Sequence, residues 1–302
     1  MEPMWRAGGT DFAKAATYIN HASSISIFTG AGISVESGIP DFRSPGGLWT
    51  KYNPYEYCDY ATFKRKPELF WRMGRALILQ IHEEKGGSRE ELLRTGEWRS
   101  AEPNAAHRAL VDFEQLGKKV TVVTQNIDGL HKVAGSSRVV ELHGTDQTCT
   151  CMACRETFPQ AEVVKQWMAL PEATRRLGPE EDGFVPCCPK TDTCSGVLKA
   201  DVTFFGEALP TGALARATGA VLGSSVCIVV GTSLNVAPAN LVPGLVKARW
   251  GKLIVCNLDE SGKDQADVFL QGRATQTLPR LLEAVRTAAA AAPRRPAPCT
   301  VS

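Results

Sequence analysis

The sequence lacks any apolar run long enough to cross a membrane, and it lacks an excess of charge of either sign. No stretch of the 302 residues approaches the roughly 18 uncharged apolar residues of a transmembrane helix. The start, MEPMWRAGGTDF, has no apolar stretch, so we expect neither a secretory signal nor an Arg- and Ser-rich transit peptide. The 34 Lys and Arg residues nearly balance the 32 Asp and Glu residues. We therefore expect no membrane association, no sequence-specific nucleic-acid binding and a cytoplasmic or nuclear location.

Short β-branched segments separated by helical patterns predict an α/β fold. The predicted strands are Ile25–Phe28, Val120–Thr124, Val139–Leu142, Val226–Val230 and Leu253–Asn257. Because they are apolar without alternation, they are typical of parallel strands buried on both faces. Helical patterns cover residues 11–22, 67–84, 104–116, 213–223, 241–250 and 278–292. The alternation predicts a doubly wound parallel sheet.

Two segments interrupt this alternation and predict a second, smaller domain. Residues 43–103 are rich in aromatics and helical in their later part, and residues 145–200 are rich in Cys and turn residues. We expect both to be insertions in a larger domain made of residues 10–42, 104–144 and 201–285. Residues 286–302 end in a Pro-rich, low-complexity stretch and are expected to form a disordered tail.

Six of the ten cysteines lie between positions 149 and 194, which predicts a metal site. Cys151 and Cys154 have the spacing of a zinc knuckle, and Cys188 and Cys194 form a looser second pair. Four thiolates leave no open coordination position, so the zinc ion is expected to be structural. Cys187 is an alternative to Cys188. A thioredoxin-like redox motif is disfavoured because Cys151 does not lie at a helix start after a strand.

The first predicted strand leads into Thr29-Gly30-Ala31-Gly32, the context of a dinucleotide-binding loop. A tight turn that requires glycine would look the same, and Val35 stands where a third glycine is usual. The long loop that follows brings Asp41, Phe42 and Arg43 beside it. Arg43 is suited to neutralise phosphate, and Phe42 to cover a flat cationic ring.

Polar residues follow the other predicted strands at the edge where α/β sheets bind ligands. Gln125, Asn126 and Asp128 follow the second strand and suit ribose hydroxyls and a carboxamide. Thr232 and Ser233 follow the fourth strand and suit phosphate and ribose, and Asn257 ends the fifth.

His143 follows the third strand and is a candidate general base. The other candidates for this role are His131, which is the nearest rival, His107, His82 and His21.

With these residues collected, the chain resembles the sirtuin family of NAD-dependent protein deacylases over about residues 25–285. The resemblance is carried by the paired cysteines and by GAGISVESGIPDFRSPGGLW (30–49), TQNIDGLH (124–131), HG (143–144), FFGEALP (204–210) and GTSLNVAP (231–238). It implies a Rossmann-like large domain, and a small domain made of a zinc module and a helical lobe. It also implies one structural Zn²⁺ and NAD consumed as a co-substrate.

The resemblance also assigns roles to individual residues. The implied catalytic residues are His143, as general base, with Asn126 and Arg43. The implied NAD site comprises Gly30, Ala31, Gly32, Ile39, Asp41, Phe42, Arg43, Gln125, Asn126, Ile127, Asp128, Gly231, Thr232, Ser233, Asn257, Leu258 and Ala274. The implied substrate-backbone contacts are Phe205, Gly206, Glu207 and Val236.

The implied reaction transfers the acyl group of a modified lysine to ADP-ribose and releases nicotinamide, lysine and O-acyl-ADP-ribose. Acylated proteins such as histones or tubulin are the implied partners, and we expect a monomer. The Tyr-x-x-Arg of the succinyl- and malonyl-preferring branch is absent, because the lobe reads Phe70-Trp-Arg-Met-Gly-Arg75. We therefore expect a neutral acyl group such as acetyl, although Arg72 or Arg75 could meet an acidic one. The alternatives are a protein ADP-ribosyltransferase using the same NAD site and a catalytically inactive NAD sensor.

Overall fold

Six parallel strands form the larger of two sheets, in the order β3-β2-β1-β7-β8-β9. The computed structural model describes residues 9–95, 97, 100–170, 183–190 and 192–291. The strands are β1 (Ser24–Thr29), β2 (Lys119–Thr124), β3 (Val139–Glu141), β7 (Val226–Val230), β8 (Lys252–Asn257) and β9 (Val268–Gln271). The first five match the predicted strands, which confirms the doubly wound α/β prediction. The sequence did not reveal β9, a short edge strand whose residues alternate between buried and more exposed.

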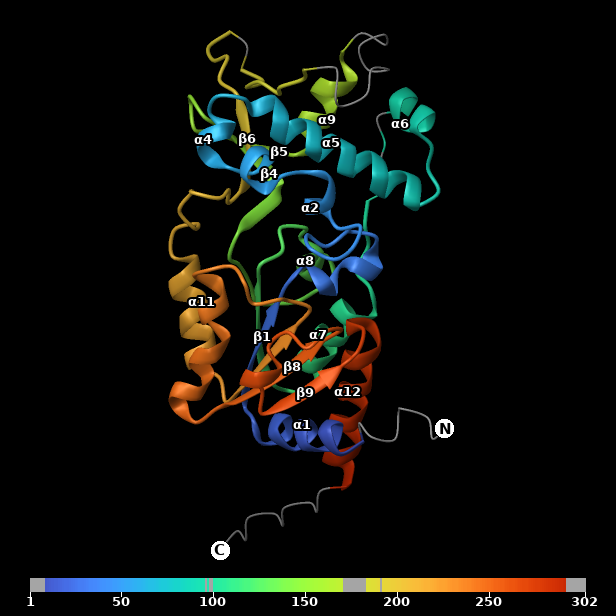
Figure 1. Ribbon diagram of the computed structural model, residues 1–302, viewed down its shortest axis with the longest axis vertical. Coiled ribbons are helices and arrows are strands. Elements are labelled where there is room, and N and C mark those ends of the chain that lie inside the picture. The colour runs from blue at the N-terminus through green and yellow to red at the C-terminus, as the bar shows by residue number, and fades with distance from the viewer. Residues whose placement is uncertain (1–8, 96, 98–99, 171–182, 191, 292–302) are drawn as a thin grey trace, which may run out of the picture.

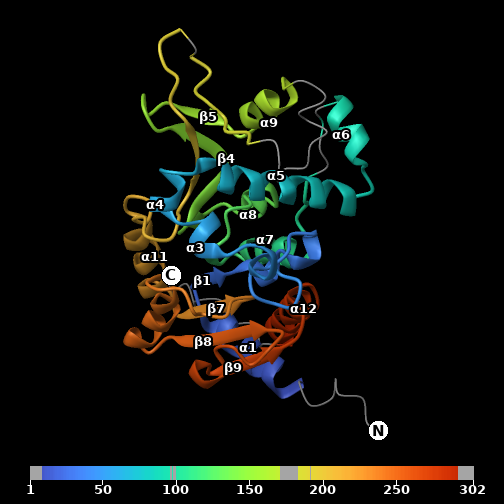
Figure 2. The ribbon, with the colours of Figure 1, turned by 45° about the horizontal axis from the view of Figure 1, so that its top comes forward.

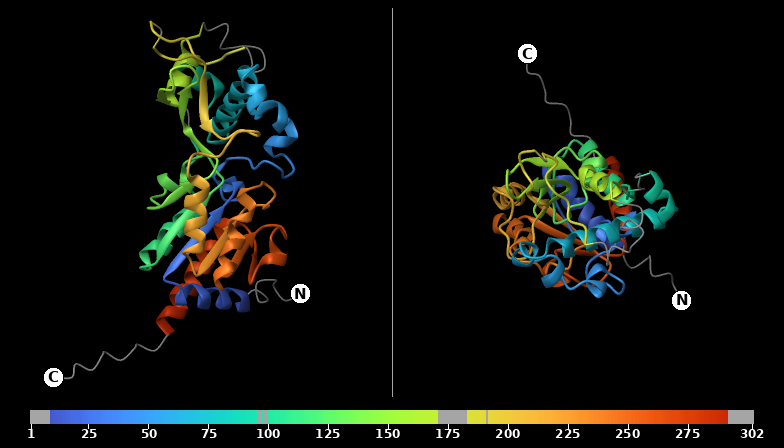
Figure 3. Two further views of the ribbon diagram at one scale, coloured as in Figure 1. Left: turned by 90° about the vertical axis from the view of Figure 1, so that its left-hand side faces the viewer. Right: turned by 90° about the horizontal axis from the view of Figure 1, so that it is seen from above.

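Helices cover both faces of this sheet (Figures 1 and 3). On one face lie α1 (Gly9–His21), α7 (Ala105–Gln115) and α12 (Ala274–Ala291); on the other lie α11 (Ala213–Leu222) and the 3₁₀ segments η3 (Ala239–Leu241) and η4 (Pro243–Arg249). Alternate strand side chains enter the two cores, because successive Cβ atoms point to opposite faces. Ile25 and Ile27 pack beneath α1 and α12, whereas Phe28 packs on the α11 side.

Two helix predictions need correction. Residues 241–250 were expected to form a regular helix, but they form 3₁₀ turns. Helix α12 begins four residues before the predicted start and ends one residue before the predicted end, so residues 286–291 belong to the predicted helix rather than to the predicted tail. An alanine-rich segment favours the helix there, and Ala288 packs on the core. Residues 292–302 of the predicted tail lie outside the described residues.

The chain order reverses between β1 and β7, and the loops that leave these strands touch through their backbones. Gly30 N donates to Val230 O at 3.0 Å, and Gly32 N donates to Gly231 O at 2.9 Å. A Cβ atom at Gly32 would lie 2.8 Å from the Gly231 Cα, so glycine is required for this approach. A crevice opens at such a switch point, beyond the carboxyl ends of the strands.

A smaller region stands above this edge of the sheet (Figure 1). It contains an antiparallel sheet in the order β5-β4-β6, with β4 (Gly144–Cys151), β5 (Thr157–Pro159) and β6 (Leu198–Val202). Its helices are α2 (Leu48–Lys51), α3 (Pro54–Tyr57), α4 (Tyr60–Phe63), α5 (Pro67–Glu84), α6 (Arg89–Thr95) and α9 (Ala161–Met168). Figure 2 shows α3 below α5, on the side of the larger sheet.

The small region has its own core, in which Trp71 of α5 and Trp167 of α9 pack with Leu198 of β6. Gly144 and residues 201–202, which the predicted division assigns to the larger domain, are strand residues of the smaller sheet. The division into domains stays a prediction. Across the described ranges, no helix has both the length and the apolar character needed to cross a bilayer.

Candidate active site

One cavity of about 1310 Å³ lies between the larger sheet and the small region. Every residue that the sequence assigns to catalysis, NAD binding or substrate binding lines this cavity. Most of the residues follow the carboxyl ends of β1, β2, β3, β7 and β8, which meet because the strands are parallel. The others come from the segment after β6 and from the start of α12. The geometry therefore brings the whole predicted set together.

Asn104 holds the glycine loop in place, a role that the sequence did not reveal. It is the N-cap of α7, and its side-chain oxygen accepts from Ala106 N at 2.9 Å. Its side-chain nitrogen donates to Ile33 O at 2.8 Å and to Ser37 Oγ at 3.0 Å. The start of α7 is thereby tied to the turns η1 (Ala31–Ile33) and η2 (Val35–Ser37), which follow β1.

Three strand ends are linked by the amide side chains at the cavity floor. Gln125 Nε2 donates to Thr232 Oγ1 at 2.8 Å. Asn257 Oδ1 accepts from Thr232 N at 3.1 Å, and Asn257 Nδ2 donates to Thr232 O at 3.0 Å. These bonds fix donors and acceptors on β2, β7 and β8 toward one end of the cavity.

A second polar network surrounds Ser34, which was inside the glycine-loop motif but received no role from the sequence. Asn126 Nδ2 donates to Ser34 Oγ at 3.1 Å, and Ser34 Oγ donates to an oxygen of Asp128 at 2.7 Å. The other Asp128 oxygen accepts from Leu130 N at 3.0 Å. Burial raises the pKa of Asp128. Asn126 and Asp128 are thus held side by side at the cavity wall.

His143 presents an unprotonated ring nitrogen. Its Nδ1 lies 3.0 Å from Gln125 O. Because a carbonyl oxygen only accepts, Nδ1 carries the proton and Nε2 keeps its lone pair. Burial lowers the pKa of His143 below the ordinary 6.5, and the bond to Gln125 opposes this only in part. The neutral ring is therefore the form present at neutral pH.

The rival histidines are structural. Of the five histidines, all within the described residues, only His143 lines the cavity. His131 lies 2.9 Å from Thr29 Oγ1, and burial lowers its pKa to about 3. His107 packs against it at a ring separation of 4.9 Å, with its pKa lowered to about 4, chiefly by burial. Both are held neutral inside the fold.

The loop after the glycine turns lies over the same end of the cavity. Arg43 is exposed, and its guanidinium is 3.4 Å from Ser233 Oγ. Phe42 stacks on Trp49 with ring centroids 5.0 Å apart. Asp41 accepts from Ser44 N at 2.9 Å, so its carboxylate shapes the loop. This arrangement leaves a cation and an aromatic face beside the Thr232 network.

The opposite side of the cavity carries a backbone strip suited to an extended peptide. Phe205 N donates to Cys58 O at 2.8 Å, and Phe205 O accepts from Tyr60 N at 3.0 Å. The Glu207 carboxylate accepts from Phe204 N at 3.0 Å and pairs with Lys199 at 3.0 Å. Gly206 and Glu207 are held in position by these contacts, and Val236 also lines the cavity.

Four cysteine thiols meet outside the cavity. The Sγ atoms of Cys151, Cys154, Cys188 and Cys194 all lie within 4.8 Å of one another. Cys151 and Cys194 Sγ are 3.6 Å apart, and Cys154 and Cys188 Sγ are 3.7 Å apart. A tetrahedral zinc ion with Zn–S bonds of about 2.3 Å separates its sulfurs by about 3.8 Å. The four thiolates therefore fit a structural zinc ion.

The structure also decides between Cys187 and Cys188. Cys187 is exposed, whereas Cys188 is buried within the cluster. Cys187 forms an antiparallel bridge with Val197, so the chain is extended there. Neighbouring side chains of an extended chain point to opposite sides, and only Cys188 points to the metal position. Cys149 is buried and lies outside the cluster.

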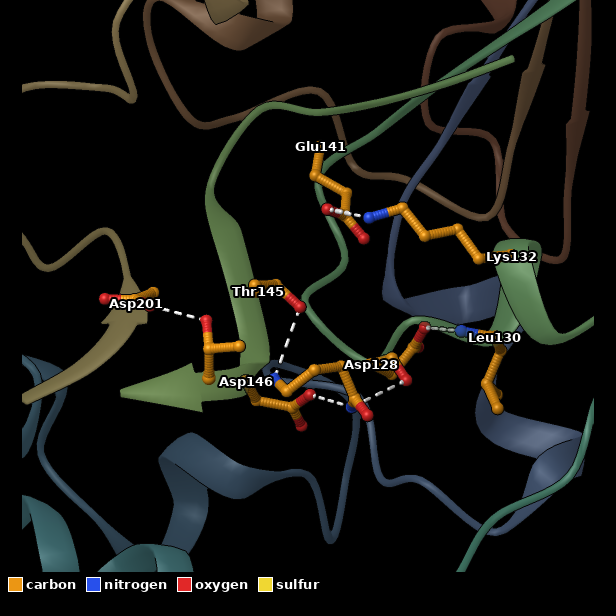
Figure 4. Close-up of polar contacts among 9 residues, drawn as sticks. Asp128, Leu130, Lys132, Glu141, Thr145, Asp146 and Asp201 are labelled. Atoms are coloured by element: carbon orange, nitrogen blue, oxygen red, sulfur yellow. Dashed lines mark hydrogen bonds and ion pairs between the residues drawn. The ribbon is translucent and has the colours of Figure 1, made fainter. Parts of the chain in front are cut away.

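Asp146, which the sequence did not single out, lines the cavity beside Asp128 (Figure 4). Its backbone N donates to Ile127 O at 3.0 Å, and its carboxylate accepts from the Gln147 amide. Burial raises the pKa of Asp146 to about 7, helped by the charges of Asp128 and Glu141 and opposed by the Gln147 bond. This carboxyl group therefore keeps its proton to a higher pH than an ordinary aspartate does.

Replacing Asp146 by Asn is expected to flatten the dependence of stability on pH. With an ordinary pKa of 3.8 and a folded value of about 7, the folded state retains a proton that the unfolded chain has released. The resulting stabilisation is complete below the unfolded pKa and is lost as pH rises through about 7. Raising the pH from about 5.5 to about 8.5 should lower the Tm of the wild type by a few degrees more than the Tm of Asp146→Asn. Thermal unfolding of both proteins across this range measures the difference. Parallel pH profiles would contradict the assignment.

Comparison with known proteins places these features in one family. The family model of the Sir2 family matches residues 30–238. The NAD-dependent protein deacetylase 1 of Pyrobaculum aerophilum is 38% identical over 274 residues, which cover 90% of this chain and 94% of the relative. A solved complex of Sir2 with a p53 peptide and NAD⁺ superposes with a TM-score of 0.72 at 32% identity, covering 89% of this chain and 96% of that one. Sir2Af2 bound to a myristoylated histone peptide superposes with a TM-score of 0.67 at 30% identity, covering 93% and 98%.

Proposed function

Because the chain belongs to the Sir2 family and is an NAD-dependent protein deacylase that forms O-acyl-ADP-ribose, we propose which of its residues carry out the reaction. The observation that carries the proposal is the position of His143. It is the one histidine, among all five described, that lines the cavity, and its Nε2 is unprotonated. Once nicotinamide has left, His143 Nε2 would take a proton from a ribose hydroxyl of the ADP-ribose group, which makes that oxygen a nucleophile toward the acyl carbon.

The two ends of the cavity bind different parts of NAD in this proposal. The backbone of the glycine loop, with Arg43, Thr232 and Ser233, offers a cation and hydroxyl donors, which fit the pyrophosphate. Gln125 and Asn257 bond to Thr232 beside this position, and their amide groups suit ribose hydroxyls. When bound, NAD supplies the electrophilic ribose carbon and the leaving nicotinamide.

The nicotinamide end is assigned to the Ser34 network. A carboxamide needs one donor and one acceptor, and Asn126 and Asp128 supply both from a buried wall. Ile39 and Ile127 line the same wall and exclude water from it. Phe42 covers the ring and keeps water from the reacting carbon.

The substrate is held as an extended strand between the Phe205–Glu207 strip and Val236. The backbone groups of Phe205 are already paired with Cys58 and Tyr60, so we assign the pairing with substrate to the backbone of Gly206 and the carbonyl of Glu207, in the manner of β-strand addition. Homologues bind a p53 peptide and a histone peptide, so we propose acylated segments of nuclear and cytoplasmic proteins, histones among them, as substrates. Such substrates agree with a nuclear or cytoplasmic location. We also propose that the enzyme acts as a monomer.

The test uses the purified chain, NAD labelled in the adenine, and an acetylated histone peptide. We expect nicotinamide, deacetylated peptide and labelled O-acetyl-ADP-ribose in equal amounts. Label on the peptide, without free O-acetyl-ADP-ribose, would instead indicate ADP-ribosyl transfer. Release of no nicotinamide from any acylated peptide by a folded, zinc-loaded protein would overturn the proposed roles.

A further inference from the structure

A chain of hydrogen bonds between side chains runs behind the cavity wall and ends on the backbone of Asn126. Thr29, at the end of β1, and Thr124, at the end of β2, are register partners on neighbouring parallel strands. Their side chains therefore point to the same face of the sheet. Thr29 Oγ1 donates to Thr124 Oγ1 at 2.7 Å, and Thr124 Oγ1 accepts from Asn126 N at 3.0 Å. Two hydroxyl groups thus join two strand ends to the turn that carries Asn126.

The other end of this chain is His131, in the short helix α8 (Leu130–Val133). Its Nε2 lies 2.9 Å from Thr29 Oγ1. A hydroxyl group has one hydrogen, and Thr29 donates its hydrogen to Thr124, so Thr29 accepts from His131 Nε2. Nε2 therefore carries the proton of the neutral ring. Nδ1 keeps the lone pair and has no hydrogen-bond partner among the described residues. The direction of each bond from His131 to Thr124 is thereby fixed.

The members of this chain are closed off from solvent and from the cavity. Thr29, Thr124 and His131 are at most 2% exposed, and none of the three lines the cavity. A buried polar group that loses its partner is costly, so each of these groups strongly favours the bond that it makes. Burial lowers the pKa of His131 to about 3, so the ring is neutral and the bonds keep their directions around neutral pH.

Asn126 is held at two points that have different effects. Its side-chain nitrogen donates to Ser34 Oγ, which directs the side chain. Its backbone N donates to the hydroxyl of Thr124, two residues earlier, and a bond of this kind closes a tight turn. That turn sets where the backbone of Asn126 lies. A shift of the turn would therefore move Asn126, and Asp128 after it, relative to the rest of the cavity wall.

We propose that His131, Thr29 and Thr124 are positioning residues, which hold Asn126 where it meets the nicotinamide end of NAD. The proposal rests on the role proposed for Asn126 and extends it to three residues that touch no substrate. Because a displacement of about 1 Å can lower a rate about 100-fold, loss of the chain should appear in kcat of the folded enzyme. The peptide strip lies on the opposite side of the cavity, so the peptide KM should change little.

The first experiment removes the Thr124 hydroxyl and keeps the shape of the side chain. Thr124→Val should lower kcat for an acetylated histone peptide about 10- to 100-fold and change the peptide KM less than about threefold. Thr124→Ser keeps the hydroxyl and should restore most of kcat. The matched control is Thr121→Val on the same strand, where the side chain points to the opposite face of the sheet. It should leave kcat and KM unchanged.

Product inhibition separates positioning from a loss of folded enzyme. The nicotinamide concentration that halves the rate does not depend on how much of the enzyme is active. Thr124→Val should raise it about tenfold, because the nicotinamide wall has moved, whereas Thr121→Val should leave it unchanged.

A second variant tests the far end of the chain. His131→Phe keeps a flat ring but cannot donate to Thr29, so it should change kcat and nicotinamide inhibition in the same direction. The double variant should lose no more than Thr124→Val alone, because both changes act through one bond to Asn126. The Tm of each variant verifies folding.

Several results would overturn the proposal. Wild-type kcat and wild-type nicotinamide inhibition in Thr124→Val would do so while leaving the deacylase function intact. An equal loss in Thr124→Ser would assign the effect to side-chain shape rather than to the hydroxyl, and additive losses in the double variant would separate His131 from Thr124. A wild-type protein that releases no nicotinamide would remove the proposed function as well. If Thr124→Val does not fold, Thr29→Val breaks the same chain and tests the same point.

Discussion

Replacing His143 by alanine is expected to lower kcat/KM for deacylation by roughly 10²–10⁴-fold, the usual contribution of a general base. The physical reason is that the cavity offers no second neutral imidazole, since His131 and His107 are buried away from it in the described structure. The ring of His143 is half-buried and bonded only through Nδ1, so its removal should leave the fold intact. Release of deacylated peptide measures the loss, and the Tm verifies folding.

The His143→Ala variant also tests how kcat/KM depends on pH. Because burial lowers the pKa of His143 below 6.5, the base stays unprotonated at neutral pH. Wild-type kcat/KM should therefore fall only as pH drops through a value below 6.5, and His143→Ala should lack this fall. His21→Ala is the matched control, because His21 lies on the exposed end of α1. An unchanged rate for His143→Ala, or an equal loss for His21→Ala, would remove His143 as the base.

Replacing Cys154 by serine is expected to abolish zinc binding and to lower the Tm by roughly 10 °C or more, because metal binding contributes directly to folding. The cluster joins Cys151, at the end of β4, to Cys188 and Cys194 before β6, and the buried members pack into the core of the small region. Loss of one ligand should loosen this region. Activity should fall with it, because β4 begins next to His143.

The control for this prediction is the neighbouring thiol. Cys187 is exposed and outside the cluster, so Cys187→Ser should retain one zinc ion per chain and the wild-type Tm. Elemental analysis of the purified proteins measures the zinc, and thermal unfolding measures the stability. Full zinc content in Cys154→Ser, or loss of zinc in Cys187→Ser, would contradict the ligand assignment.

Much of the cavity was predictable because its signals are local. A β-branched run followed by glycines or amides marks a strand and its carboxyl end, and parallel strands bring those ends to one edge. Gln125, Asn126, His143 and Thr232 could be placed together on that basis. The sixth strand gave no comparable signal, since β9 has four residues and only alternate burial.

The residues that support the site were harder to find. Ser34 and Asn104 act through hydrogen bonds to partners about 70 to 90 positions away in the chain. No local pattern reports such partners.

The sequence by itself determined the family, the parallel α/β sheet, the cavity residues at the strand ends and the presence of a four-cysteine metal site. These follow from residue types and short-range spacings, which can be recognised in the chain without its folded structure. The sequence favoured Cys188 over Cys187 and His143 over His131, and the tertiary structure agrees: Cys188 lies in the thiol cluster and His143 lines the cavity, whereas Cys187 is exposed and His131 is buried elsewhere. The direction and the burial of a side chain depend on residues that are distant in the sequence, so a local pattern does not give them.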